Sequence, residues 1–67
     1  MRVRKGDIVR NKKTRRIGMV KKTRVWGYVP PLMCVIFRDR PFTCFVEKSQ
    51  YVLHTRREDI TQPWCYL

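Results

Sequence analysis

The sequence predicts a small all-β protein, a single barrel of five short strands. Short apolar and β-branched runs recur along the 67 residues, and turn-forming or charged residues separate them. No stretch shows the apolar period of 3.6 residues that a long helix would need. Hydrophobic residues make up 43% of the chain, which supports a modest core in one small domain.

The first two expected strands lie at 7–10 and 17–24, on either side of a polar loop at 11–16. Gly18, near the start of the second strand, predicts a bulge, a bend or the close approach of another backbone. The later half of the second strand holds few apolar residues, so we expect it to project beyond the core.

Residues 25–31 form a long connection that contains Trp26 and Tyr28 and ends in Pro30-Pro31. The two prolines force extended backbone at that point. The aromatic side chains can either cap an end of the barrel as part of the core or stay exposed beside the basic strand. Exposed rings next to cations can stack on unpaired nucleic-acid bases, and the sequence leaves both alternatives open.

The central expected strand is 32–37, which is apolar on both faces. A turn at 38–41 leads into a strand at 42–46, because Pro41 disfavours helical backbone at the residue before it. A short strand at 51–53 completes the set of five.

Thr55 and Glu58 have the spacing of a capping box, in which a threonine hydroxyl and a glutamate three residues later satisfy free amides at a helix start. We therefore expect a short helical turn near 56–60. Ile60 is expected to close the bottom of the barrel.

Three parts are expected along the chain: a basic arm at 1–5, the barrel at 6–60 and an aromatic tail at 61–67. Trp64 and Tyr66 in the tail are residue types that anchor protein interfaces. The tail can pack on its own barrel or on a neighbouring protein. We favour a neighbour, because the barrel is complete without the tail.

The positive charge is concentrated in the first 24 residues. The net charge is +11 and the pI is about 10.5. Residues 1–24 hold 11 of the 16 Lys and Arg residues and one acid, a net charge of +10, whereas 25–67 carry only +1. One basic face and a polyanionic partner are therefore expected, in preference to a merely solvated surface. The residues expected to bind the polyanion are Arg10, Lys12, Lys13, Arg15, Arg16, Lys21, Lys22 and Arg24, with Trp26 and Tyr28 stacking on bases.

The three cysteines and the single histidine do not have the spacing of a metal site. Structural zinc sites pair their ligands two to four residues apart, and Cys34, Cys44, His54 and Cys65 are not so paired. We expect no metal and treat Cys34 and Cys44 as core residues. A disulfide between these two stays possible, although so few cysteines indicate a reducing compartment.

We expect no catalysis, no cofactor and no small-molecule substrate. The acids are scattered, and the adjacent pair Glu58-Asp59 has a structural use at a helix start. A Cys44–His54 dyad would need a shared cleft, which a domain of this size rarely forms.

A membrane span is also not expected. The longest apolar run is 32–37, far short of the ~20 residues that a spanning helix needs. The basic residues at the start are not followed by the apolar stretch of a signal peptide. The expected location is the cytoplasm, which is a reducing compartment.

Four motifs follow one another in the order of a known family: Gly-Asp-Ile-Val-Arg at 6–10, Ile-Gly-Met-Val at 17–20, Val-Ile-Phe at 35–37 and Arg-Glu-Asp-Ile at 57–60. This order resembles small SH3-like barrels with a KOW-like opening, and most of all the very short versions encoded by bacteriophages. The resemblance covers roughly residues 5–60. It implies contact with RNA, ribosomes or RNA polymerase, or a place in a virion. The chain departs from the KOW pattern in the loop at 26–31 and in its aromatic tail.

The leading expectation is a non-enzymatic module whose basic N-terminal half contacts nucleic acid, a nucleoprotein assembly or an acidic protein surface. The alternative is a small structural component of a virion or other large assembly, docked between larger subunits through Pro30, Pro31, Trp64 and Tyr66. A third possibility is a phage-made modulator of a host protein such as RNA polymerase.

Overall fold

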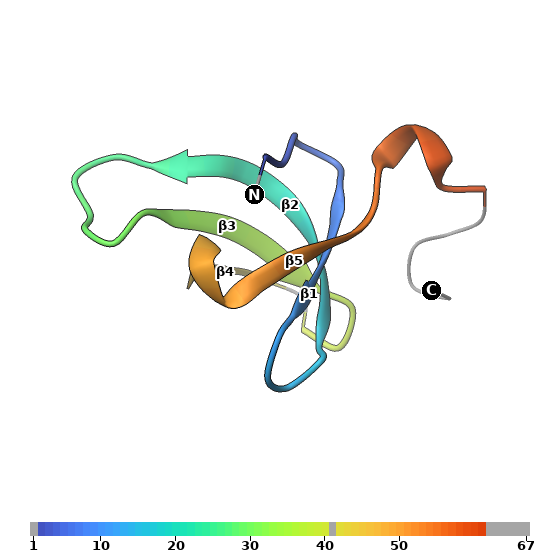
Figure 1. The fold of residues 1–67 in the computed structure, drawn as a ribbon, viewed down its shortest axis with the longest axis horizontal. Helices are drawn as coiled ribbons and strands as arrows, with labels where there is room; N and C mark the ends of the chain where they lie inside the picture. The colour runs from blue at the N-terminus through green and yellow to red at the C-terminus, as the bar shows by residue number, and fades with distance from the viewer. Residues whose placement is uncertain (1, 41, 62–67) are drawn as a thin grey trace.

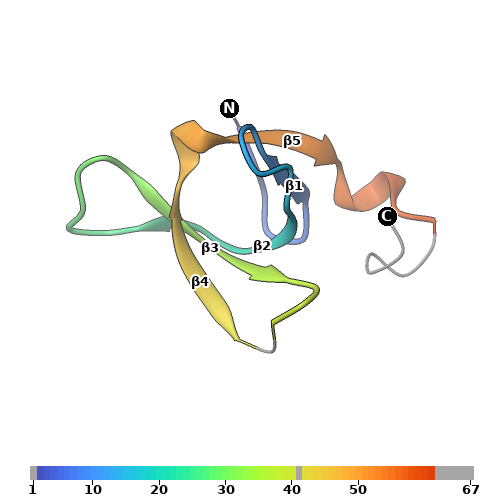
Figure 2. The same cartoon turned by 90° about the horizontal axis from the view of Figure 1, so that it is seen from below.

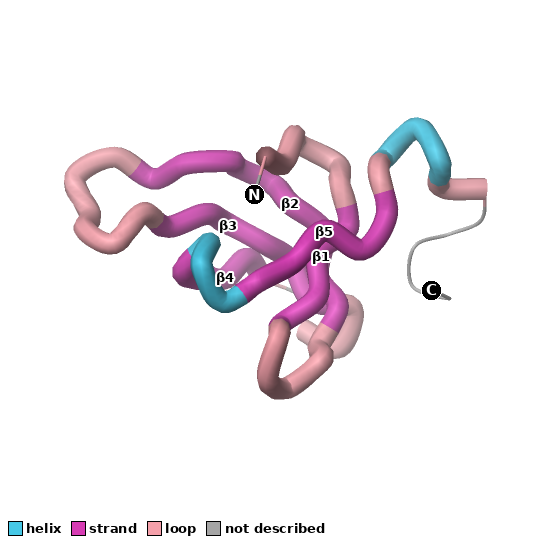
Figure 3. Tube along the Cα trace, in the orientation of Figure 1, coloured by secondary structure: helices cyan, strands magenta, loops and turns pink. Residues whose placement is uncertain are grey.

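A computed structural model of the protein describes residues 2–40 and 42–61 (Figure 1). One antiparallel sheet contains five strands, in the order β4-β3-β2-β1-β5. Two single 3-10 turns, η1 and η2, precede and follow β5 (Figure 3). The elements are β1 at Ile8–Asn11, β2 at Ile17–Val25, β3 at Leu32–Phe37, β4 at Thr43–Glu47, η1 at Lys48–Gln50, β5 at Tyr51–Thr55 and η2 at Arg57–Asp59.

The predicted all-β class and the five strands are confirmed, with strand ends that differ from the expected ones by at most two residues. The sheet curls round on itself, and η1 joins its two edge strands, β4 and β5 (Figure 2). The register shifts between Ile8 and Val9 on β1, and twice on β2 after Val20. Such irregularities bend strands, which lets a short sheet curl.

The core lies inside this curl and takes side chains from β1, β2, β3 and β5. Val3 of the arm and Cys44 and Val46 of β4 pack against it. Ile60 is half-buried and is not among the residues that pack on this cluster, so the expected closure by Ile60 is not observed. The core cluster consists of Val9, Val20, Met33, Val35, Phe37 and Tyr51.

Gly18 lies on β2 between β1 and β3. It is paired with Val9 on one side and with Phe37 on the other. A Cβ atom at this position would lie 3.3 Å from the Ile36 carbonyl oxygen and 3.3 Å from the Phe37 ring. The predicted close approach of another backbone is therefore confirmed, whereas the bulges occur elsewhere.

The second half of β2 leaves the core, as its polar sequence predicted. Lys21, Lys22 and Arg24 are exposed, and the β2–β3 hairpin extends away from the rest of the sheet (Figure 1). The register shift between Val20 and Lys22 means that these two residues do not share a face.

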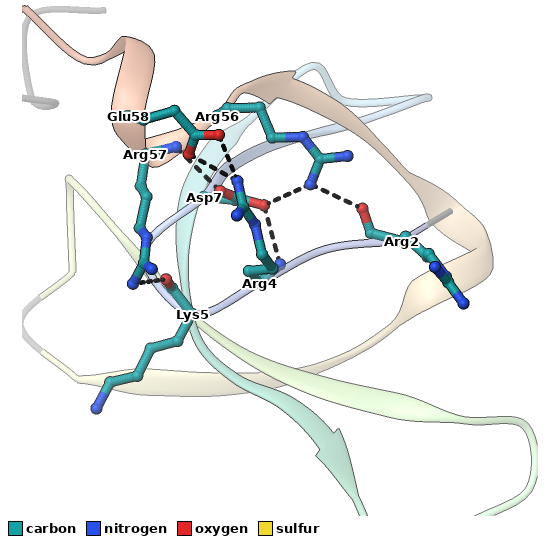
Figure 4. Close-up of polar contacts among 7 residues, drawn as sticks. All are labelled: Arg2, Arg4, Lys5, Asp7, Arg56, Arg57 and Glu58. Atoms are coloured by element: carbon teal, nitrogen blue, oxygen red, sulfur yellow. Dashed lines mark hydrogen bonds and ion pairs between the residues drawn. The ribbon is translucent and has the colours of Figure 1, made fainter.

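Asp7 joins the two ends of the described chain. Its side chain is fully buried, and three N–H groups point at its carboxylate (Figure 4). Oδ2 accepts from the Arg4 amide at 2.9 Å and from the Arg56 guanidinium at 3.0 Å, and Oδ1 accepts from the Arg57 amide at 3.0 Å. The arm and η2, some 50 residues apart, are thereby held on one carboxylate.

The capping box predicted at Thr55 and Glu58 is wrong. Thr55 ends β5, and Arg56 precedes η2 without a side-chain capping bond. Glu58 instead accepts from the guanidinium of Arg4 at 2.6 Å. Asp7 satisfies the first free amide of the turn, because a buried carboxylate from a distant part of the chain replaces the local threonine hydroxyl.

The environment of Asp7 favours its ionised form. Burial alone raises the pKa of the carboxyl, because it penalises charge. The hydrogen bonds from the Arg57 and Arg4 amides and from the Arg56 side chain outweigh burial, so the pKa of Asp7 lies below its ordinary value. Asp39 and Glu58 also have lowered pKa values, chiefly because Arg16 and Arg4 donate hydrogen bonds to them.

Asp7→Asn should destabilise the protein by about 2–3 kcal/mol, because the new amide NH₂ faces donors and the Arg56 charge loses its partner. The cost stays below that of a fully buried pair, since Arg56 is one-third exposed. Urea unfolding followed by circular dichroism measures it. Asp59→Asn removes the same charge from an exposed side chain and should change stability by less than about 0.5 kcal/mol. Equal unfolding midpoints for the two variants would contradict this role for Asp7.

Stability should fall in acid. Because the pKa of Asp7 is lowered in the folded state, the unfolded chain binds the proton more readily. The free energy of unfolding therefore decreases as the pH falls through and below about 4. The free energy of unfolding, measured in urea from pH 7 to pH 2.5, should therefore decline more steeply in the wild type than in Asp7→Asn. Parallel curves for the two proteins would show that Asp7 does not titrate differently in the folded state.

Candidate functional site

The basic side chains divide into two classes according to their partners. Arg4, Arg16 and Arg56 pair with Glu58, Asp39 and Asp7 at 2.6, 2.8 and 3.0 Å. These pairs use three of the five acids of the chain. Within 2–40 and 42–61, Arg2, Lys5 and Arg57 are exposed without a carboxylate partner, and so are six cations of the β1–β2 loop and of β2: Lys12, Lys13, Arg15, Lys21, Lys22 and Arg24.

The loop between β1 and β2 presents the first three of these cations in a fixed turn. Asn11 Oδ1 accepts from the amides of Lys13 at 2.8 Å and Thr14 at 2.9 Å. Arg15 has a left-handed backbone with φ of 63°, and its amide donates to the Asn11 carbonyl at 3.0 Å. Asparagine bonds of this kind close turns locally, so the backbone directs the loop cations outward.

Arg16 has a different role from its neighbours in the sequence. Its guanidinium lies 4.4 Å from the centre of the Phe37 ring and donates to both oxygens of Asp39. It therefore connects this loop to the turn after β3. A surface hollow of about 380 Å³ lies beside this contact, lined by Thr14, Arg15, Arg16, Ile17, Arg38 and Asp39.

The other three cations, Lys21, Lys22 and Arg24, lie on the projecting half of β2. The β1–β2 loop and the β2–β3 hairpin lie at different ends of the molecule (Figure 1). Along nine residues of strand the two groups are up to roughly 25 Å apart. Arg10 is half-buried on β1. The single basic cluster expected from the sequence is thus two groups, which we call the loop cations (Lys12, Lys13, Arg15) and the hairpin cations (Lys21, Lys22, Arg24).

Trp26 and Tyr28 are exposed, which resolves the alternatives that the sequence left open. Trp26 is 77% exposed, and the Arg24 guanidinium lies 4.1 Å from the centre of its ring. Tyr28 is 52% exposed and lies 6.5 Å, centroid to centroid, from the ring of Phe45. Neither ring belongs to the core cluster.

Phe45 is a surface aromatic that the sequence analysis did not single out. It is 60% exposed on β4, while its neighbours Cys44 and Val46 pack against the core. Side chains of a strand point to opposite faces in turn, so Phe45 lies on the face opposite to Cys44 and Val46. All three residues are apolar, so the sequence alone does not tell which face is buried.

The residues expected to dock a partner are described only in part. Pro30 and Pro31 are exposed in the β2–β3 hairpin, next to Val29, which is 97% exposed. Trp64 and Tyr66 lie outside the described residues.

Cys34 and Cys44 are free, and the strand register explains why they do not form a disulfide. Cys34 is opposite Phe45, whereas Cys44 is opposite Val35, so the two sulfurs belong to opposite faces of the sheet. Within the described part of the chain no three His, Cys, Asp or Glu side chains are grouped to hold a metal ion. Cys65 lies outside that part.

A scan against protein-family models found no matching family, and searches of curated proteins and of solved structures found no match either. In the described residues, no helix has the length and apolar character needed to cross a membrane.

Proposed function

We propose that this protein is a non-enzymatic module that binds a polyanion, namely nucleic acid or a nucleoprotein assembly. One observation carries the proposal: three of the five acids are used in ion pairs with arginines, while the loop and hairpin cations are exposed without carboxylate partners in the described chain. The remaining positive charge is therefore available to an external anion. Phosphates meeting these side chains release counterions, which favours binding and makes it sensitive to salt.

We also infer that the barrel is of the SH3-like type with a KOW-like opening. The strand order β4-β3-β2-β1-β5, with a 3-10 turn before the last strand, supports this inference. Binding of this kind is not expected to be sequence-specific, because phosphate contacts position a protein without reading bases.

A second candidate is a small component of a larger assembly, such as a virion, docked between bigger subunits. The exposed apolar tip of the β2–β3 hairpin favours it, since Val29 is almost fully exposed and is followed by Pro30 and Pro31. A location in the cytoplasm or in a virus particle is compatible with both candidates.

The loop cations provide the test. We expect Lys12→Gln/Lys13→Gln/Arg15→Gln to weaken oligonucleotide binding at least about 10-fold and to lower the slope of log Kd against log salt by roughly 2–3. Fluorescence anisotropy with labelled single- and double-stranded oligonucleotides across a salt series measures both quantities. Glutamine keeps the side-chain length, and Arg16 is left intact because it pairs with Asp39.

The matched control is Arg2→Gln/Lys5→Gln/Lys48→Gln, which removes the same charge from outside both cation groups and should weaken binding less than about threefold. An equal loss in the two variants would indicate a non-specific effect of net charge. No binding by the wild type at ~100 mM salt would exclude free nucleic acid and favour the assembly component.

A further inference from the structure

Three aromatic rings are exposed on the β2–β3 hairpin and on β4 beside it, and two of them, Tyr28 and Phe45, have centroids 6.5 Å apart. We call Trp26, Tyr28 and Phe45 the aromatic face. Their side chains are 77%, 52% and 60% exposed, so none is used to build the core. Large exposed rings grouped in this way indicate a binding surface, whereas apolar residues scattered singly on a surface would need no explanation.

The strand register places a cation in the same row as one of these rings. Cys34 on β3 is opposite Lys22 on β2 and opposite Phe45 on β4. Residues opposite one another share a face of the sheet, so Lys22 and Phe45 lie on the outer face, two strand spacings or about 10 Å apart. Met33 and Val35, the neighbours of Cys34, point into the core.

The rings are arranged so that they remain open to a ligand. Tyr28 and Phe45 are inclined at 59° with centroids 6.5 Å apart, and each stays at least half exposed. Arg24 lies over the ring of Trp26 at 4.1 Å, which places a guanidinium beside the exposed indole. Glu47 is in the next row, opposite Leu32, where it is half-buried and accepts a hydrogen bond from Gln50.

We propose that this surface binds single-stranded nucleic acid, with unpaired bases stacked on the aromatic face and phosphates on the hairpin cations. The inference rests on the proposed function and specifies the ligand class. A single strand offers both phosphates and exposed base planes, whereas a duplex hides the planes in its stack. Aromatic rings interleaved with Lys and Arg are how proteins hold single strands.

The test compares three labelled ligands of equal length: a single-stranded oligo(dT), a duplex containing it, and an abasic single strand with the same phosphates but no bases. The wild type should bind oligo(dT) at least about 10-fold more tightly than either of the others at one salt concentration. Tyr28→Leu/Phe45→Leu should lose that preference, weakening oligo(dT) binding about 10- to 100-fold, and should leave duplex binding unchanged.

Phe42→Leu is the matched control. Phe42 is 57% exposed but precedes β4, outside the aromatic face, so its loss should have no effect on any of the three ligands. Trp26→Leu gives a second variant on the aromatic face, in a loop where folding is not at risk. Urea unfolding confirms that each variant is folded.

The outcomes separate this inference from the proposed function. Equal binding of oligo(dT), duplex and abasic strand, unaffected by Tyr28→Leu/Phe45→Leu but weakened by loss of the loop cations, overturns the inference alone. Binding of none of them overturns both. A stronger effect of the aromatic variants on poly-glutamate or on anionic lipid vesicles than on oligo(dT) would show that the surface serves a protein or a membrane, and would also overturn the inference.

Discussion

The buried carboxylate of Asp7 is the contact on which the rest of the structure depends. A charge taken out of water is costly unless it is paired and hydrogen-bonded, and here two backbone amides and a guanidinium meet it. The amides come from the arm and from η2, so one side chain fixes the chain before β1 and after β5. A domain of this size has a small core and a small free energy of unfolding. A single polar contact of this kind therefore contributes a large share of its stability.

The same contact helps to explain where the free charge lies. Asp7, Asp39 and Glu58 are held by arginines that link distant segments of the chain. Few acids are left to neutralise the remaining cations, which are exposed on a loop and on a projecting hairpin. The ion pairs that stabilise the fold and the proposed binding surface therefore depend on the same division of the charged residues. Arg4, Arg16 and Arg56 pair with acids of the chain, while the loop and hairpin cations face solvent.

Local patterns predicted the local features of the fold. Apolar runs and turn residues located all five strands, and a close backbone approach, one of the three alternatives predicted at Gly18, is observed. Features that depend on distant partners could not be read in this way. Arg16 resembles Lys12 in the sequence, but its partner Asp39 is 23 residues away. The capping box failed for the same reason, because Asp7 reaches the turn from across the fold, and the exposure of Phe45 depends on which face of β4 the barrel buries.

The most direct test of the division between structural and binding charges is an amide NMR titration of the ¹⁵N-labelled wild type with oligo(dT). The structure predicts that shifts concentrate at 12–15, at 21–28 and at Phe45, while the Arg4 and Arg57 amides bound to Asp7 stay in place. Shifts centred on Arg4 and Arg57, or spread evenly over the chain, would contradict it.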